Sequence, residues 1–171
     1  MKDDKGRTTL RFERVLGHPI ERVWQALIDP AEQDAWHPTP FEIEPLTDGT
    51  VRYLSSADAP AMPDGKVLEH EPPHVLAHTW GEDLLRWELH PHQEGCLLVL
   101  THTFDDHLKA ARDAAGWHLC LDSMRSSLSN QQTVGEQPSH RGPSQGWREL
   151  NSEYEQRFGI PADQATPPPA R

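Results

Sequence analysis

Hydrophobic and polar residues alternate from Thr8 to Leu16, which places Leu10 and Phe12 on one face and Arg11 and Glu13 on the other. A period of two predicts a half-buried strand. Beyond Gly17-His18-Pro19 the period lengthens to that of an amphipathic helix, and the apolar positions are Ile20, Val23, Trp24, Leu27 and Ile28. Asp29-Pro30-Ala31-Glu32 then carries the capping residues of a second short helix, which ends near Trp36.

From Phe41 onward, short apolar-rich runs follow one another at even spacing without a helical pattern between them. The predicted strands are Phe41–Leu46, Thr50–Leu54, Lys66–Glu71, Val75–Trp80, Leu84–His90 and Cys96–Phe104. Thr47-Asp48-Gly49 is a strong hairpin signal between the first two. This order favours an antiparallel meander over a parallel sheet.

One long helix is predicted over Leu108–Gln131, with Trp117, Cys120, Leu121, Met124 and Leu128 on its apolar face. Gly116 would cost about 1 kcal/mol inside a helix, so we expect it to allow a close neighbour or to mark the helix start. Residues 8–131 are therefore expected to form one domain and 132–146 a polar linker. A short C-terminal helix over 147–160 is expected to pack on the same domain, ahead of a disordered tail over 161–171.

The predicted fold class is α+β: a curved antiparallel sheet of about six or seven strands wrapped around a long C-terminal helix, with two short helices after the first strand. A sheet that curves around one helix seldom seals at both ends. We therefore expect a ligand-binding cavity between them.

The run Pro19-Ile20-Glu21-Arg22-Val23-Trp24-Gln25-Ala26-Leu27-Ile28-Asp29-Pro30, followed by Trp36, resembles the opening signature of the START-like, birch-pollen-allergen-like and polyketide-cyclase superfamily. Further matches are Gly65 with Val67 and Glu69, Pro72-Pro73 with Thr79-Trp80, Gly95 with Leu98 and Leu100, and Gly116-Trp117. The branch it most resembles is the domain related to the activator of the heat-shock chaperone ATPase. The resemblance covers Thr8 to Gln131 and implies the helix-grip fold. It is hardly specific for function, because members bind lipids, hormones, polyketides or chaperones.

The formal net charge is −11 at pH 7, from 16 Lys and Arg against 27 Asp and Glu. A surface of this sign repels phosphates, so we expect no nucleic-acid partner. No apolar run reaches the roughly 20 residues of a membrane span, and the charged N-terminus is not a secretory signal. Cys96 and Cys120 are expected to be reduced core thiols, which fits a cytoplasmic protein.

The strand and helix periods predict which side chains face the interior. Together with two residues near the expected mouth, Trp36 and Met62, the candidate ligand-binding residues are His78, Trp80, Trp87, Leu89, Leu100, His102, Phe104, Trp117, Cys120, Leu121 and Met124. The same pattern also fits side chains that simply fill the core. Buried indole and imidazole nitrogens need a hydrogen-bond partner, which a ligand or ordered water would supply.

His78 and His102 are the best candidates for polar contacts, and three roles stay open for them: hydrogen bonding within the protein, anchoring a ligand, or acid-base catalysis. No paired carboxylate or nucleophile is evident beside either histidine, so we name no catalytic residue. His70, His74, His90 and His92 lack metal-ligand spacing and are expected to be exposed loop residues. We expect no metal and no cofactor.

Leu97 and Val99 alternate with the inward residues and are therefore expected on the outer face of the sheet. Exposed there, they would favour a homodimer or cover by the C-terminal helix. Three functions follow. The favoured one is binding of a small hydrophobic molecule, for sensing, sequestration or a stress response. The alternatives are a cyclase- or aromatase-like enzyme using His78 or His102, and a chaperone-associated or dimeric interaction domain.

Overall fold

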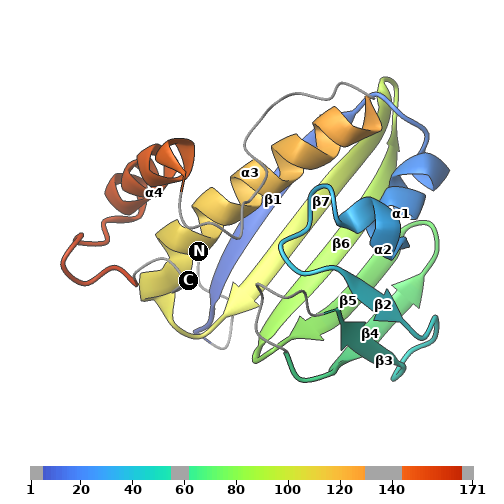
Figure 1. The fold of residues 1–171 in the computed structure, drawn as a ribbon, viewed down its shortest axis with the longest axis horizontal. Helices are drawn as coiled ribbons and strands as arrows, with labels where there is room; N and C mark the ends of the chain where they lie inside the picture. Colours follow the sequence, from blue (N-terminus) through green and yellow to red (C-terminus); the bar gives the residue numbers. More distant parts are fainter. Residues whose placement is uncertain (1–5, 55–61, 130–143, 167–171) are drawn as a thin grey trace.

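Seven strands form one antiparallel sheet in the order β1-β7-β6-β5-β4-β3-β2 (Figure 1). This computed structural model describes residues 6–54, 62–129 and 144–166. The strands are β1 Thr8–Leu16, β2 Phe41–Ile43, β3 Thr50–Tyr53, β4 Gly65–Glu71, β5 Val75–Trp80, β6 Asp83–His92 and β7 Gly95–Phe104. The sheet confirms the predicted α+β meander. His70, His90 and His92 were expected to be exposed loop residues, but His70 belongs to β4 and His90 and His92 belong to the end of β6.

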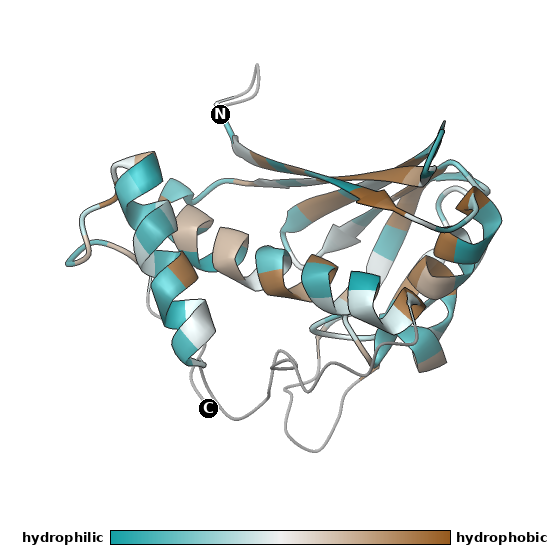
Figure 2. Cartoon of the chain, turned by 90° about the horizontal axis from the view of Figure 1, so that it is seen from above, coloured by the Kyte–Doolittle hydropathy of each residue, from teal (hydrophilic) through white to brown (hydrophobic). Residues whose placement is uncertain are grey.

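The inner face of the sheet carries the buried alternate residues. On β6 and β7, Trp87 pairs with Leu100 and Leu85 pairs with His102, and all four are buried. Because neighbouring strands keep this register, large side chains line up across the sheet. The long helix crosses this face (Figure 2), so the core lies between sheet and helix.

Two short helices follow β1: α1 is Ile20–Ile28 and α2 is Pro30–Gln33. The buried side of α1 consists of Val23, Trp24, Ala26 and Leu27. Asp29 caps α2, because its carboxylate accepts a hydrogen bond from the Ala31 amide at 2.9 Å. Both helices lie at one end of the sheet (Figure 1). This position brings the segment after α2 toward the core.

The long helix starts with a short 3-10 turn, η1 His107–Lys109, and continues as α3 Ala110–Leu128. The last two residues of the predicted helix lie outside the described residues. Gly116 lies inside α3, and a Cβ built on it meets no described atom within 4 Å. Gly116 therefore does not begin the helix, and among the described residues no neighbour outside its own helix approaches it closely.

The last helix, α4 Gln145–Phe158, lies beside α3. It begins two residues before its predicted start at Trp147, because the Ser144 side chain accepts a hydrogen bond from the Trp147 amide at 3.0 Å. Tyr154 Oη and His118 Nδ1, 3.0 Å apart, join α4 to α3.

Residues 161–166 form a turn rather than the expected disordered tail. The Thr166 amide donates to the Leu108 carbonyl at 3.3 Å, and Ala165 packs against the core.

The outer face of β1, β7 and β6 is covered by charged side chains, which corrects one expectation. Val99 is only 1% exposed, and its register partners on the two flanking strands are Glu13 and Glu88. Glu13 pairs with Arg11 and Glu88 with Arg86. Long charged side chains cover apolar neighbours with their aliphatic stems, so an outward direction did not leave Val99 exposed.

Candidate functional site

Four tryptophans from four different parts of the chain meet on the inner face of the sheet. Trp36 follows α2, Trp80 and Trp87 belong to β5 and β6, and Trp117 belongs to α3. Ring centroids lie 5.7 Å apart for Trp36 and Trp87, 5.5 Å for Trp87 and Trp117, and 5.4 Å for Trp80 and Trp117. These are edge-on or tilted contacts, the arrangement that aromatic quadrupoles favour.

Every residue predicted to line a ligand site lies in this core or against it. Two of them, Met62 and Trp80, are only partly buried and pack against the core from its edge. The others are buried: Trp36, His78, Trp87, Leu89, Leu100, His102, Phe104, Trp117, Cys120, Leu121 and Met124.

His78 is held within a closed set of internal hydrogen bonds. The Trp87 indole N–H donates to Nε2 of His78 at 3.3 Å, which fixes the proton on Nδ1. That Nδ1 lies 3.2 Å from Tyr53 Oη and 3.1 Å from the Thr79 carbonyl. Tyr53 Oη in turn donates to the same carbonyl. Both nitrogens of His78 are therefore used by the protein.

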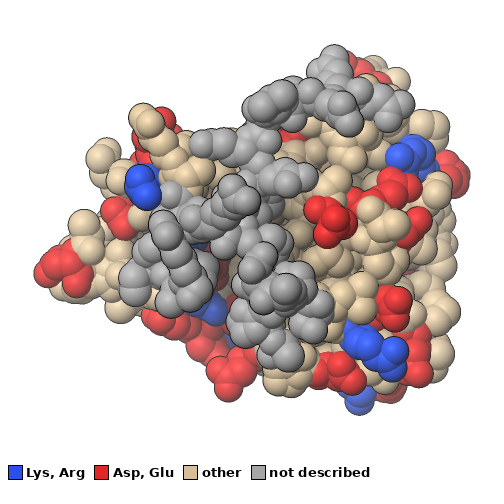
Figure 3. Space-filling view, viewed as in Figure 1, with Lys and Arg blue, Asp and Glu red and all other residues tan. Residues whose placement is uncertain are grey.

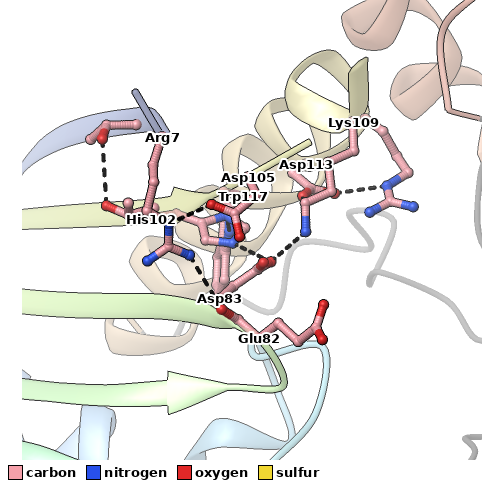
Figure 4. A network of polar contacts seen from close by, with 11 residues as sticks. Arg7, Glu82, Asp83, His102, Asp105, Lys109, Asp113 and Trp117 are labelled. Atoms are coloured by element: carbon pink, nitrogen blue, oxygen red, sulfur yellow. Dashed lines mark hydrogen bonds and ion pairs between the residues drawn. The ribbon is translucent and has the colours of Figure 1, made fainter. Parts of the chain in front are cut away.

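His102, on β7, also accepts a hydrogen bond from an indole, here one that belongs to α3 (Figure 4). The Trp117 indole N–H donates to Nδ1 of His102 at 3.1 Å, so the proton lies on Nε2. Nε2–H donates to Asp83 Oδ2 at 2.9 Å, and Lys109 Nζ donates to the same oxygen at 2.6 Å. Helix and sheet are thus joined by an indole-imidazole-carboxylate-ammonium chain.

Burial sets the protonation state of the interior groups. It lowers the pKa of His78 to about 4, so the ring is neutral at physiological pH. Burial alone would raise the pKa of Asp83, but the hydrogen bonds from His102 and Lys109 outweigh it and lower the pKa. Burial also raises the pKa of Cys120 to about 12, which keeps that thiol protonated and unreactive.

For both histidines the geometry fits internal hydrogen bonding, the first of the three roles left open by the sequence. Acid-base catalysis needs a ring nitrogen within reach of the substrate. His78 and His102 have none free.

His37 is the residue that sequence reasoning missed. It follows α2 directly, is 4% exposed, and lies among aromatic rings, with centroids 5.1 Å from Phe41 and 5.5 Å from Trp117. The Thr39 amide donates to its Nδ1 at 3.1 Å. Its place between Trp36 and Pro38 in a presumed loop gave no sign of burial. The nearest signal was the adjoining tryptophan.

Two buried side-chain nitrogens in this aromatic cluster have no hydrogen-bond partner among the described residues. They are His37 Nε2 and Trp80 Nε1. The two rings are neighbours, with centroids 6.4 Å apart. A buried polar group without a hydrogen-bond partner costs about 1 to 3 kcal/mol. Two such groups side by side therefore indicate that a hydrogen-bond partner is missing at this place in the interior.

Asp83, His102 and Asp113 each offer a ligand atom, and these atoms lie within 4.8 Å of one another. Their hydrogen bonds oppose a metal ion. Metal binding needs the lone pair of His102 Nε2, but the Trp117 N–H already occupies the lone pair of Nδ1 and leaves the proton on Nε2. Lys109 lies against Asp83, and the Arg112 guanidinium donates to Asp113 at 2.7 Å. We therefore interpret the cluster as an ion-pair network.

Acidic side chains outweigh basic ones on the face of the molecule in Figure 3, in keeping with the net charge. In the described part of the chain, no helix has both the length and the apolar character needed to cross a membrane.

Comparison with known proteins identifies a family. The family model described as Activator of Hsp90 ATPase homolog 1-like protein matches residues 17–129. No curated protein matches the chain. Among similar solved structures is the protein encoded by gene BPP1335 from Bordetella parapertussis, which is 30% identical with a TM-score of 0.69, over 87% of this chain and 85% of that one.

Two more distant structures share the fold. A conserved protein of unknown function from Enterococcus faecalis, EF2215, has a TM-score of 0.73 at 15% identity, covering 92% of this chain and 88% of that one. CalU16 from Micromonospora echinospora has a TM-score of 0.66 at 18% identity, covering 93% and 91%.

Proposed function

The chain belongs to the family of Activator of Hsp90 ATPase homolog 1-like proteins, and from this premise we propose that it binds a small, mostly hydrophobic molecule between the inner face of the sheet and α3. The observation that carries the proposal is the meeting of four tryptophan rings from separate elements. They form one apolar cluster in which Trp80 is only partly buried, and Met62, also partly buried, packs against the same core. Aromatic walls with a few polar atoms are typical of small-molecule sites.

The proposed site is a binding site rather than a catalytic one. The nitrogens of His78 and His102 are engaged within the protein, and the Cys120 thiol is protonated. The role that fits is sensing or sequestration of the ligand.

Titration with N-phenyl-naphthylamine, a neutral dye that fluoresces in apolar surroundings, tests the proposal. We expect dye emission excited through the tryptophans, and its loss in Met124→Arg, which places a charge in the interior. Val15→Arg is the matched control, because Val15 is 40% exposed on the outer face of β1. Near-ultraviolet circular dichroism checks that both variants fold. If neither this dye nor palmitate binds the wild type, the proposal fails.

The description of the family makes a chaperone-associated role the alternative. It would show as a change in the ATPase rate of purified Hsp90 on adding the protein. An unchanged rate together with dye binding favours the ligand site.

A homodimer through the outer face remains a separate proposal, now resting on Leu97 and its register partner Val15, since Val99 is buried. Light scattering decides it. A monomer in both the wild type and Leu97→Glu removes its support.

A further inference from the structure

The unmet hydrogen bonds in the aromatic cluster specify the polar group of the ligand. His37 follows α2 and Trp80 belongs to β5, and the centroid of each ring lies within 5.5 Å of that of Trp117. His37 Nε2 and Trp80 Nε1 are buried and have no partner among the described residues. Buried polar atoms in folded proteins are nearly always satisfied, so such atoms point to a missing partner.

Both atoms are hydrogen-bond donors. An indole nitrogen can only donate. For His37, burial, with a smaller contribution from the nearby His78, lowers the pKa to about 3, so the ring is neutral. Its Nδ1 accepts from the Thr39 amide, which leaves the hydrogen on Nε2. The missing partner must therefore accept twice, or offer two acceptors.

A carbonyl oxygen meets this requirement better than water. Such an oxygen has two lone pairs and no hydrogen. A water molecule that accepts hydrogen bonds from both donors still has two O–H groups of its own, and each needs an acceptor. The only other unpartnered buried side-chain atom among the described residues is the hydroxyl of Thr8, at the start of β1.

The charge of the surroundings selects a neutral acceptor. Trp80 packs against His102, with centroids 5.7 Å apart, and Asp83 is hydrogen-bonded to that histidine. The cations of that network are already paired, Lys109 with Asp83 at 2.6 Å and Arg112 with Asp113 at 2.7 Å. With the described cations of the network paired, a buried ligand carboxylate would face only two neutral N–H groups there, which is costly.

Resting on the proposed function, we propose that His37 Nε2–H and Trp80 Nε1–H together bind the carbonyl oxygen of a neutral aromatic ligand, whose rings pack among Trp36, Trp80 and Trp117. The aromatic walls supply affinity and the two donors fix the orientation.

The test uses two probes that differ at one atom: methyl naphthyl ketone, and isopropenylnaphthalene, in which CH2 replaces the oxygen. Calorimetry on the full chain gives the ratio of their affinities. We expect Trp80→Phe and His37→Phe each to lower this ketone-to-hydrocarbon ratio about fivefold, the worth of one hydrogen bond of ordinary strength. Trp24→Phe is the matched control, because Trp24 is a buried tryptophan of α1 whose ring lies against His70 and is not one of the four clustered tryptophans. It should leave the ratio unchanged.

The wild-type protein gives a second readout that needs no substitution. In a proton-nitrogen correlation spectrum, the Trp80 indole signal should move downfield with the ketone and not with the hydrocarbon. The Trp87 and Trp117 indole signals should move little, since their donors are already used.

The outcomes separate the two proposals. If both probes bind but the ratio is the same in every variant, the donor pair is not the anchor and the apolar site stands. If neither probe binds and the Trp80 indole proton shows a lasting contact with solvent water, an ordered water occupies the donors, and both proposals fail.

Discussion

Trp117 Nε1 donates to Nδ1 of His102 at 3.1 Å, and this bond between helix and sheet determines where the histidine carries its proton. With Nδ1 occupied, Nε2 holds the hydrogen and gives it to Asp83. Trp80 packs on the same histidine and on Trp117, yet its own indole N–H has no partner among the described residues. Two tryptophans in contact thus differ in whether the indole N–H is used as a hydrogen-bond donor.

This difference predicts unequal costs for the same substitution. Trp117→Phe removes a donor from a buried acceptor, which costs about 1 to 3 kcal/mol in addition to the lost ring volume. Trp80→Phe breaks no hydrogen bond with a described residue. We therefore expect its loss of unfolding free energy to be about 1 to 2 kcal/mol smaller than that of Trp117→Phe. Urea denaturation followed by circular dichroism measures both. Equal losses would contradict the assigned hydrogen bond.

The buried histidines predict a loss of stability in mild acid. The pKa of His37 is lowered to about 3 and that of His78 to about 4, chiefly by burial, against 6.5 for the free side chain. Below pH 6.5 and above the lowered pKa values, the unfolded chain binds more protons than the folded one. The free energy of unfolding therefore falls as the pH falls from 6.5 toward 4. Each group contributes a slope of up to about 1.4 kcal/mol per pH unit.

Comparison of the wild type with His37→Phe isolates one of these contributions. We expect the stability of the variant to depend less steeply on pH between about 6 and 4, while carboxylates contribute equally to both proteins. Urea titrations at several pH values give the two slopes. Parallel lines would show that His37 is protonated in the folded protein or is solvated there.

The sequence predicted the fold because alternation and helical spacing are local signals. The period of two from Thr8 to Leu16 and from Val75 to Trp80 reproduces β1 and β5 to the residue. Outward direction, however, did not predict exposure. Val99 is buried because flanking charged side chains cover it, and that depends on strand order.

The candidate site was less predictable, because hydrogen-bond partners come from distant parts of the chain. The alternation of the strands placed His78 and His102 in the interior. It could not show that the indoles of Trp87 and Trp117 donate hydrogen bonds to them. Asp83 lies one residue before the predicted strand Leu84–His90, yet it begins β6 and accepts a hydrogen bond from His102, 19 positions along the chain. Burial of His37 depends on the path after α2, which carries no periodic signal.

Gly116 offers a stabilising substitution. It lies in the interior of α3, and a Cβ there meets no described atom within 4 Å apart from its chain neighbours and its own helix backbone. Gly116→Ala should raise the free energy of unfolding by about 1 kcal/mol, because alanine loses less backbone entropy in a helix. Thermal unfolding provides the measurement.

Gly49 is the matched control for that substitution. A Cβ at this hairpin position would lie 2.5 Å from the Glu44 carbonyl oxygen and 2.8 Å from that of Leu46. Gly49→Ala should therefore destabilise the protein. A gain at Gly49, or a loss at Gly116, would contradict the described backbone.

The last prediction concerns zinc, for which Asp83, His102 and Asp113 have suitable ligand atoms within 4.8 Å of one another. We expect calorimetry to show no stoichiometric binding to the wild type, because His102 Nε2 carries a hydrogen and Lys109 occupies Asp83. The double variant Trp117→Phe with Lys109→Met removes both obstacles, since the proton can then move to Nδ1 and the carboxylate is free. The double variant should bind zinc tightly, and adding His102→Ala should abolish that tight binding. Tight zinc binding by the wild type would mean that the proton lies on Nδ1, and the Trp117 hydrogen bond as described would be wrong.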